Sequence, residues 1–150
     1  MTEKPEIDKQ ALLDFANNIP FLQLIGLEVI DMEPGWSKTS VEYREDLCQP
    51  AGILHGGVMA TLVDTGIAHA LMLTDVFHDS IAKGGALVSV DLRIRYFRSV
   101  STGTIYCESR IPRMGRQIFH GESVVTNAEG KEVARGDSIY MAVAAAKLEK

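Results

Sequence analysis

The segment from Gly56 to Leu73 is the most apolar part of the chain, and it carries a single carboxylate, Asp64. Apolar side chains occur all around the helix that this segment would form, so the helix has no polar face. A helix that is apolar all round is expected to be buried all round. The simplest arrangement is a sheet curled about it. The sequence therefore predicts an α+β fold, with a long central helix wrapped by an antiparallel sheet.

The flanking sequence supplies the other elements of this fold. Helical spacing over residues 7–19 predicts a helix near the N-terminus with Asp8 as its N-cap. Pro20 is expected to end that helix, a short turn to follow it, and the polar stretch 74–85 to be a loop. No repeat or linker divides the chain, so one domain is expected over residues 1–150. The strands, a hairpin and then an antiparallel meander, are expected over residues 27–32, 37–43, 86–97, 103–115, 116–126 and 132–143.

Residues 86–97 show the clearest strand alternation in the sequence. One face is expected to carry Val88, Val90, Leu92, Ile94 and Tyr96, and the other Ser89, Asp91, Arg93 and Arg95.

Composition excludes several classes of protein. The net charge of −5 provides no basic excess for a nucleic-acid surface. Cys48 and Cys107 lie far apart, outside any C-x-x-C motif, which is typical of free thiols in a reducing compartment. The charged N-terminus lacks the apolar region of a signal peptide, and the apolar segment carries Asp64 and His69 without a basic flank, unlike a membrane span. We expect a cytoplasmic protein with no membrane association, and the four histidines form no metal-ligand spacing.

Asp64 allows two interpretations. An ionised carboxylate in an apolar place costs several kcal/mol unless it is paired, so it could be a structural acid bonded to a hydroxyl or an arginine. It could equally be a catalytic acid or base. The preceding His55-Gly56-Gly57 opens the helix with no side chain in the way. Its first N–H groups have no intrahelical partners, so a substrate carbonyl could be polarised there.

The motif "HGGVMATLVDTGIAHAL", followed by "VSVDLRIRYF", resembles the hot-dog-fold acyl-CoA thioesterases of the PaaI (phenylacetate-pathway) type. The resemblance extends from about Leu24 to Ala142. It implies a hot-dog fold, dimers paired into homotetramers, and hydrolysis of an acyl-CoA thioester. It implies no cofactor, because coenzyme A is part of the substrate.

Site residues follow from the same resemblance. Asp64 matches the catalytic nucleophile or general base, Gly57 the glycine whose N–H polarises the thioester carbonyl, and His55 the histidine beside it. Ser89 matches a residue that helps to place the attacking water. Where relatives often carry Asn, this chain has Gln49, which keeps the amide group and adds a methylene. The nucleotide end of coenzyme A is polyanionic and needs local cations, for which Arg113 and Arg116, with Arg98, Arg110 and Arg135, are the candidates. Gly56 and Gly115 are expected to contact the substrate as well.

Helix geometry predicts how these residues meet. Asp64 lies seven residues beyond Gly57, about 10 Å along the axis at ~1.5 Å per residue. The reacting groups must meet within roughly 3 to 3.5 Å of one point. We therefore expect a homodimer in which two central helices lie antiparallel across a two-fold axis, and the acid of one chain serves the glycine N–H of the other. On this hypothesis Asp64 has no partner within its own chain.

Two other functions fit the same fold. One is a hot-dog enoyl-acyl hydratase or dehydratase, whose usual acid–histidine signatures are missing here. The other is a non-catalytic acyl-CoA-binding domain, which would have no use for Asp64. Hydration of crotonyl-CoA, as opposed to release of free thiol, would distinguish the first of these from a thioesterase.

Overall fold

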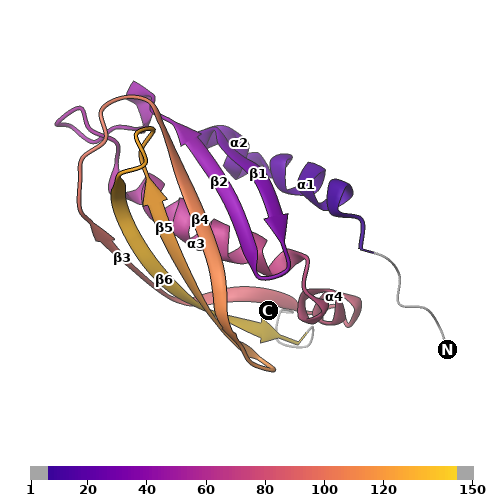
Figure 1. Ribbon diagram of the computed structural model, residues 1–150. Coiled ribbons are helices and arrows are strands. Elements are labelled where there is room, and N and C mark those ends of the chain that lie inside the picture. The colour runs from indigo at the N-terminus through magenta and orange to yellow at the C-terminus, as the bar shows by residue number, and fades with distance from the viewer. Residues whose placement is uncertain (1–6, 145–150) are drawn as a thin grey trace.

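The computed structural model describes residues 7–144, and its main feature is a curved antiparallel sheet of six strands around one long helix (Figure 1). Neighbouring strands follow the order β1-β2-β4-β5-β6-β3, so β1 and β3 are the two edges of the sheet. The strands are β1 (Leu27–Glu33), β2 (Trp36–Glu42), β3 (Ala86–Tyr96), β4 (Thr104–Met114), β5 (Ile118–Thr126) and β6 (Glu132–Val143). The predicted hot-dog architecture is confirmed.

The long helix, α3 (Gly56–Met72), packs closely against the inner face of the sheet. A row of serines on adjacent strands lies beneath it, with Ser37 opposite Ser109 and Ser109 opposite Ser123. The Ser37 hydroxyl donates to the carbonyl of Gly66 at 2.6 Å, and a Cβ on Gly66 would collide with the Ser109 side chain. Small residues on both surfaces thus let the helix axis approach the sheet.

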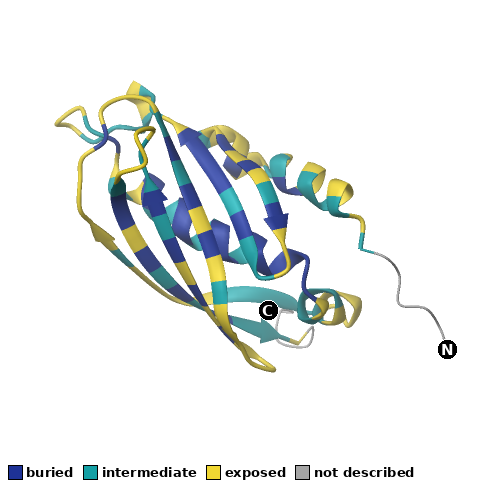
Figure 2. Ribbon diagram, in the orientation of Figure 1, coloured by how far each residue is buried: buried dark blue, intermediate teal, exposed yellow. Residues whose placement is uncertain are grey.

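One stripe of α3 is not covered by its own chain. Six positions along one side of α3 are exposed or only half-buried. Most of the remaining helix is buried, and its turns behind the sheet are largely dark blue in Figure 2. The expectation that α3 is buried all round is therefore wrong for the single chain, because the sheet and the N-terminal segment cover only part of its circumference. The stripe comprises Gly57, Ala60, Thr61, Asp64, Thr65 and Ala68.

Short helices replace two of the expected irregular segments. The predicted N-terminal helix is confirmed as α1 (Lys9–Asn17), with the Asp8 side chain accepting from Ala11 N at 3.0 Å. The expected turn after Pro20 is instead α2 (Pro20–Ile25), because proline is well suited to the first helical turn. The expected polar loop 74–85 is largely α4 (Asp75–Ala82), whose N-cap Thr74 accepts from Phe77 N.

Strand β3 departs from the regular alternation that the sequence predicts. Ser89 is opposite Tyr140 in β6, but Asp91 is opposite Ile139, so Val90 is an extra residue in a bulge. The bulge reverses the faces of the strand at this point. Ser89 therefore lies on the inner face together with Leu92, whereas regular alternation would have separated them.

Within residues 7–144, no single helix combines the length and apolar composition needed to cross a membrane. Only α3 and α4 taken together meet those two criteria, and they are bent by 84° at the break between them.

Candidate active site

The start of α3 is tightly organised around its two glycines. His55 is the N-cap, and its Nδ1 accepts the Gly57 N–H at 2.8 Å. The Tyr96 hydroxyl donates to the Gly56 carbonyl at 3.0 Å, and a Cβ on Gly56 would lie 2.9 Å from the Tyr96 ring. Glycine is therefore required at position 56 for the approach of this ring, and the N–H that we expected to be free for a carbonyl is capped by an imidazole.

Two pockets lie on either side of this helix start. The larger has a volume of about 370 Å³ and the smaller about 280 Å³. The larger is lined by Gln49, Ile53, Leu54, Gly56, Met59, Tyr96, Phe97, Arg98 and Ser99. The smaller is lined by Ile25, Asp46, Leu47, Cys48, His55, Gly57, Val58 and Thr61. The segment that enters α3 thus lies between two pockets, and each pocket is lined by one of the two glycines.

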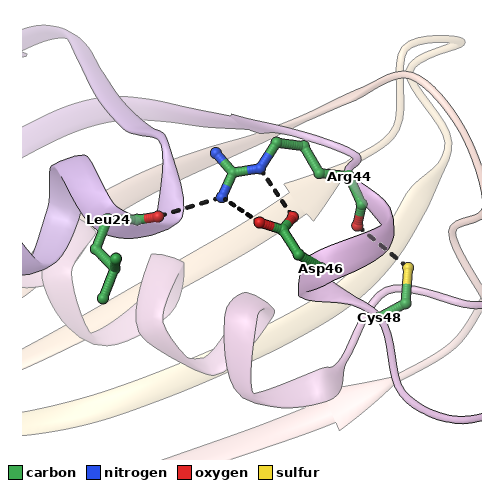
Figure 3. Close-up of polar contacts among 4 residues, drawn as sticks. All are labelled: Leu24, Arg44, Asp46 and Cys48. Carbon is green, nitrogen blue, oxygen red and sulfur yellow. Dashed lines mark hydrogen bonds and ion pairs between the residues drawn. The ribbon is translucent and has the colours of Figure 1, made fainter.

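The wall of the smaller pocket is fixed by Arg44 (Figure 3). Its guanidinium donates to Asp46 Oδ1 at 3.0 Å and to the carbonyl of Leu24 at 3.2 Å, which ties the loop before α3 to the end of α2. The Cys48 thiol donates to the Arg44 carbonyl at 3.3 Å. These contacts hold in place the short segment that faces His55 and Gly57.

Gln49 lies at the larger pocket, close to Gly56, and forms part of a tight turn. Its Oε1 accepts the Ala51 N–H at 2.7 Å, and its main chain exchanges hydrogen bonds with the turn that follows. Its amide nitrogen has no acceptor among residues 7–144. Within one chain, the structure therefore places this amide donor beside the helix start, about two helical turns from Asp64.

Asp64 has a partner within its own chain, which corrects the expectation that it has none. The Tyr140 hydroxyl of β6 lies 2.9 Å from Asp64 Oδ1 and 2.9 Å from the Asp64 carbonyl oxygen. Tyr140 is only 5% exposed, and burial together with the nearby charge of Asp64 raises the pKa of its phenol. The other carboxylate oxygen, Oδ2, has no partner in the described part of the chain, and the residue is half-buried on the open stripe of α3.

Ser89 reaches the same region because of the bulge in β3. It lies opposite Tyr140, and residues directly opposite on antiparallel strands have side chains on the same face. Its hydroxyl lies 3.2 Å from that of Ser138, which in turn donates to the Asp91 carbonyl at 2.7 Å. Since Ser138 uses its proton on that carbonyl, Ser89 is the donor of the pair, and its own oxygen remains able to accept.

The predicted phosphate-binding residues do not meet the helix start within one chain. Arg113, Gly115 and Arg116 form the β4–β5 hairpin tip, near the C-terminal end of α3 (Figure 1). The Gly115 N–H is used by the turn itself and donates to Ile118 O at 2.9 Å. Arg116 lines a pocket of about 420 Å³ together with residues of α4.

Two buried titratable groups lie apart from the site. Burial lowers the pKa of His69 to about 4, and its Nδ1 has no hydrogen-bond partner. Burial raises the pKa of Cys107 to about 11, and both Cys48 and Cys107 are free thiols, as expected. Among residues 7–144, no group of three His, Cys, Asp or Glu side chains is arranged to hold a metal ion.

Site residues thus form two groups in one chain. Gln49, His55, Gly56 and Gly57 gather at the start of α3. Asp64 lies further along the helix against Tyr140, and Ser89 is opposite Tyr140 in the neighbouring strand. Sequence reasoning missed Tyr96 and Tyr140. For Tyr140 a signal existed, since a tyrosine on the core face of a strand usually needs a partner for its hydroxyl.

Comparison with known proteins gives the family. The chain has the hot-dog architecture of the thioesterases. The model of the Thioesterase superfamily matches residues 51–134, more than half of the sequence, and the chain belongs to this superfamily. Thioester hydrolysis is its general activity.

Two relatives agree with this assignment, and two solved structures share the fold. Acyl-coenzyme A thioesterase 13 of Homo sapiens is 29% identical over 119 residues, which cover 77% of this chain and 80% of that protein. The proofreading thioesterase EntH of Klebsiella pneumoniae is 29% identical over 132 residues, with 87% and 90% covered. The thioesterase HI1161 of Haemophilus influenzae superposes with a TM-score of 0.79 at 20% identity, with 100% of both chains covered. The E. coli PaaI protein superposes with a TM-score of 0.75 at 19% identity, with 89% and 91% covered.

Proposed function

We propose that this chain hydrolyses acyl-CoA thioesters to the free acid and coenzyme A, with Asp64 as its catalytic acid–base group. The observation that carries the proposal is the state of Asp64: one carboxylate oxygen is held by Tyr140, and the other is unpartnered on a half-buried stripe. Because Oδ2 is not buried beneath other atoms of the described chain, it is accessible to a water molecule or a substrate. The name of the human relative, acyl-coenzyme A thioesterase 13, supports coenzyme A as the thiol.

Asp64 acts best as a general base toward water. Oδ2 takes a proton from a water molecule while the water oxygen attacks the thioester carbonyl carbon. The Ser89 oxygen accepts a hydrogen bond from the other O–H of that water, because the Ser89 hydroxyl hydrogen is already donated to Ser138. The tetrahedral intermediate then collapses, the C–S bond breaks, and the coenzyme A thiolate recovers the proton from Asp64.

The thioester carbonyl is polarised at the start of α3. The Gly57 N–H is the donor that we assign to the oxyanion, and the helix dipole adds positive potential there. Because His55 Nδ1 occupies this N–H at 2.8 Å, the imidazole must turn aside when the carbonyl binds. Gln49, whose amide nitrogen has no acceptor in the described part of the chain, is close enough to the Gly56 pocket to assist.

The distance along α3 argues for a dimer with shared sites. Asp64 and Gly57 are seven residues apart on a regular helix, about 10 Å at ~1.5 Å per residue. Attack on the carbonyl carbon requires the reacting atoms to lie roughly 3 to 3.5 Å apart. Rotation of the short Asp64 side chain cannot bridge the distance back to Gly57 of the same helix. Two antiparallel α3 helices, related by a two-fold axis, bring each Asp64 to the other chain's Gly57.

Surfaces suited to such a dimer lie next to each other in the single chain. The open stripe of α3 includes Ala60 and Ala68, which permit close approach of a second helix. Strand β3 is an edge of the sheet, and an unpaired edge is a template for a further strand. Strand β3 and the residue that follows it expose large apolar side chains, those of Val90, Leu92, Tyr96 and Phe97.

The same dimer gives the hairpin arginines a role. In an antiparallel pair, the C-terminal end of one α3 lies beside the N-terminal end of the other. Arg113 and Arg116 of the partner subunit then approach the pockets at Gly56 and Gly57, where the phosphates of coenzyme A need cations. We further propose that two such dimers pair into a tetramer and that the protein acts in the cytoplasm. Catalysis needs no metal or cofactor, because a thioester is already electrophilic.

A thiol-release screen tests the function directly. Purified protein is incubated with short, medium, long and aromatic acyl-CoAs, and free thiol is measured against Asp64→Asn as the matched control. At least one acyl-CoA should release thiol at a rate that the control loses. Hydration of crotonyl-CoA without thiol release would contradict the proposal and favour a hydratase, and binding without turnover by any substrate would favour a binding domain.

A further inference from the structure

The strongest unassigned feature is the contact between Tyr140 and Asp64, and its interpretation rests on the proposed role of that acid. The Tyr140 oxygen is 2.9 Å from Asp64 Oδ1 and 2.9 Å from the Asp64 carbonyl oxygen. One hydroxyl therefore bridges the side chain and the main chain of the same residue. This bridge restrains the side-chain torsions of Asp64, which a single contact to Oδ1 would leave freer.

The bridge comes from a rigid part of the molecule. Tyr140 lies within β6, between the hydrogen-bonded neighbours β5 and β3, and is nearly buried. Its raised pKa, caused first by burial and then by the charge of Asp64, keeps the phenol protonated, so that it remains a hydrogen-bond donor. Sites built on strands and helices hold reacting groups more accurately than sites built on loops.

The register of the sheet places the second polar group of the site on the same support. Ser89 lies directly opposite Tyr140. Ser89 and Tyr140 thus face each other across one strand pair. A water that contacts both Asp64 Oδ2 and the Ser89 hydroxyl would be positioned directly by Ser89 and, through Asp64, by Tyr140. A shift of the carboxylate would misalign it with Ser89 as well as with the substrate.

We propose that Tyr140 is a positioning residue for hydrolysis: it holds Asp64 Oδ1 so that Oδ2 alone is presented to the attacking water. It exchanges no proton with the substrate. The proton leaves the water for Oδ2 and returns to the leaving thiolate, while the Tyr140 O–H bond stays intact throughout.

Tyr140→Phe removes only the hydroxyl and is the test. We expect kcat to fall about tenfold with KM changed less than twofold, because positioning affects the reacting atoms more than binding. The acid limb of the pH–rate profile should move to higher pH, since a base that loses a hydrogen-bond donor is protonated more readily. Tyr106→Phe is the matched control, because Tyr106 lies near the start of β4 beside Lys38, and it should leave all three quantities unchanged.

A double substitution identifies the residue through which Tyr140 acts. In the Asp64→Asn background, Tyr140→Phe should cause no further loss of turnover. An additional tenfold loss there would overturn the proposal, as would a single variant that melts earlier but turns over normally per folded molecule. If Tyr140→Phe does not fold, 3-fluorotyrosine at position 140 keeps the shape and the donor. It should preserve kcat within about threefold, and a larger loss would also overturn the proposal.

Failure of this inference differs from failure of the proposed function. Normal turnover by Asp64→Asn removes the catalytic role of the acid, whatever Tyr140 does. An inactive Asp64→Asn variant combined with a fully active Tyr140→Phe variant removes only the positioning role.

Discussion

Subunit complementation tests the proposed active site that two chains share. Asp64→Ala removes the proposed base, and Gly57→Pro removes the N–H that we assign to the thioester carbonyl. Proline is tolerated in the first turn of a helix, and a Cβ at position 57 would meet only the movable His55 side chain, at 2.9 Å. Each variant alone should be nearly inactive, because every site in its homodimer lacks one of the two groups.

Mixed dimers should recover a defined fraction of activity. Under random pairing of equal amounts, about half of the dimers are mixed, and each mixed dimer has one site with both groups and one site with neither. About a quarter of all sites should therefore be active. The assay is thiol release by co-expressed, doubly tagged protein, normalised to wild type.

A reciprocal mixture serves as the control. Wild type is combined with the double variant Gly57→Pro/Asp64→Ala in equal amounts. Shared sites leave only wild-type homodimers active, about a quarter of all sites, whereas sites contained in one chain leave about half active. The shared-site model would be refuted by two results together. The single variants would form mixed dimers without recovering activity, and the control mixture would keep about half of the wild-type activity.

Three further predictions concern single residues. Asp64→Asn should keep the fold and lose roughly 10²-fold or more of kcat, the usual loss for a positioned base; a lower melting temperature with normal turnover would instead indicate a structural acid. A single turnover in ¹⁸O-water, read by mass spectrometry, should place the label in the product acid, and label in Asp64 would identify a nucleophile. His69, whose pKa is lowered to about 4 by burial, binds a proton only in the unfolded chain between pH 6.5 and 4. Protonation of His69 in the unfolded chain therefore lowers the free energy of unfolding as the pH falls from 6.5 to 4, by about 3 kcal/mol in total, and has no effect above pH 6.5. Urea unfolding at a series of pH values should show this slope, and His69→Gln should reduce it.

Much of the fold could be predicted because it depends on local pattern. The apolar run that begins at Gly56 and the alternating strands define a helix and a sheet that can only bury each other. Helix α4 was missed because its 8 residues are too few to show a clear helical periodicity, although Thr74 followed by Asp75 is a recognisable N-terminal signal. The bulge in β3 was missed because one extra residue leaves the alternation of the sequence intact and changes only its register with β6.

The candidate site was predicted less completely, for a different reason. Asp64, Gly57 and His55 lie in one continuous motif, so their proximity in sequence is informative. Tyr140 is 76 residues from Asp64, and their contact depends on the order of the strands and the rotation of α3. No local pattern encodes such a contact, and the tertiary fold alone reveals that the acid has a partner within its own chain.

The bulge at Val90 also limits how this strand can change during evolution. Loss of Val90 itself would leave Ser89 and Leu92 two positions apart, so a regular β3 would keep both on the inner face. Loss or gain of one residue in the regular part of β3 beyond Leu92 would instead turn the apolar side chains that follow it away from the helix. Length changes in this regular part of β3 are therefore expected to be tolerated far less than loss of Val90 or length changes in the β4–β5 hairpin, although β3 and the hairpin are both largely exposed.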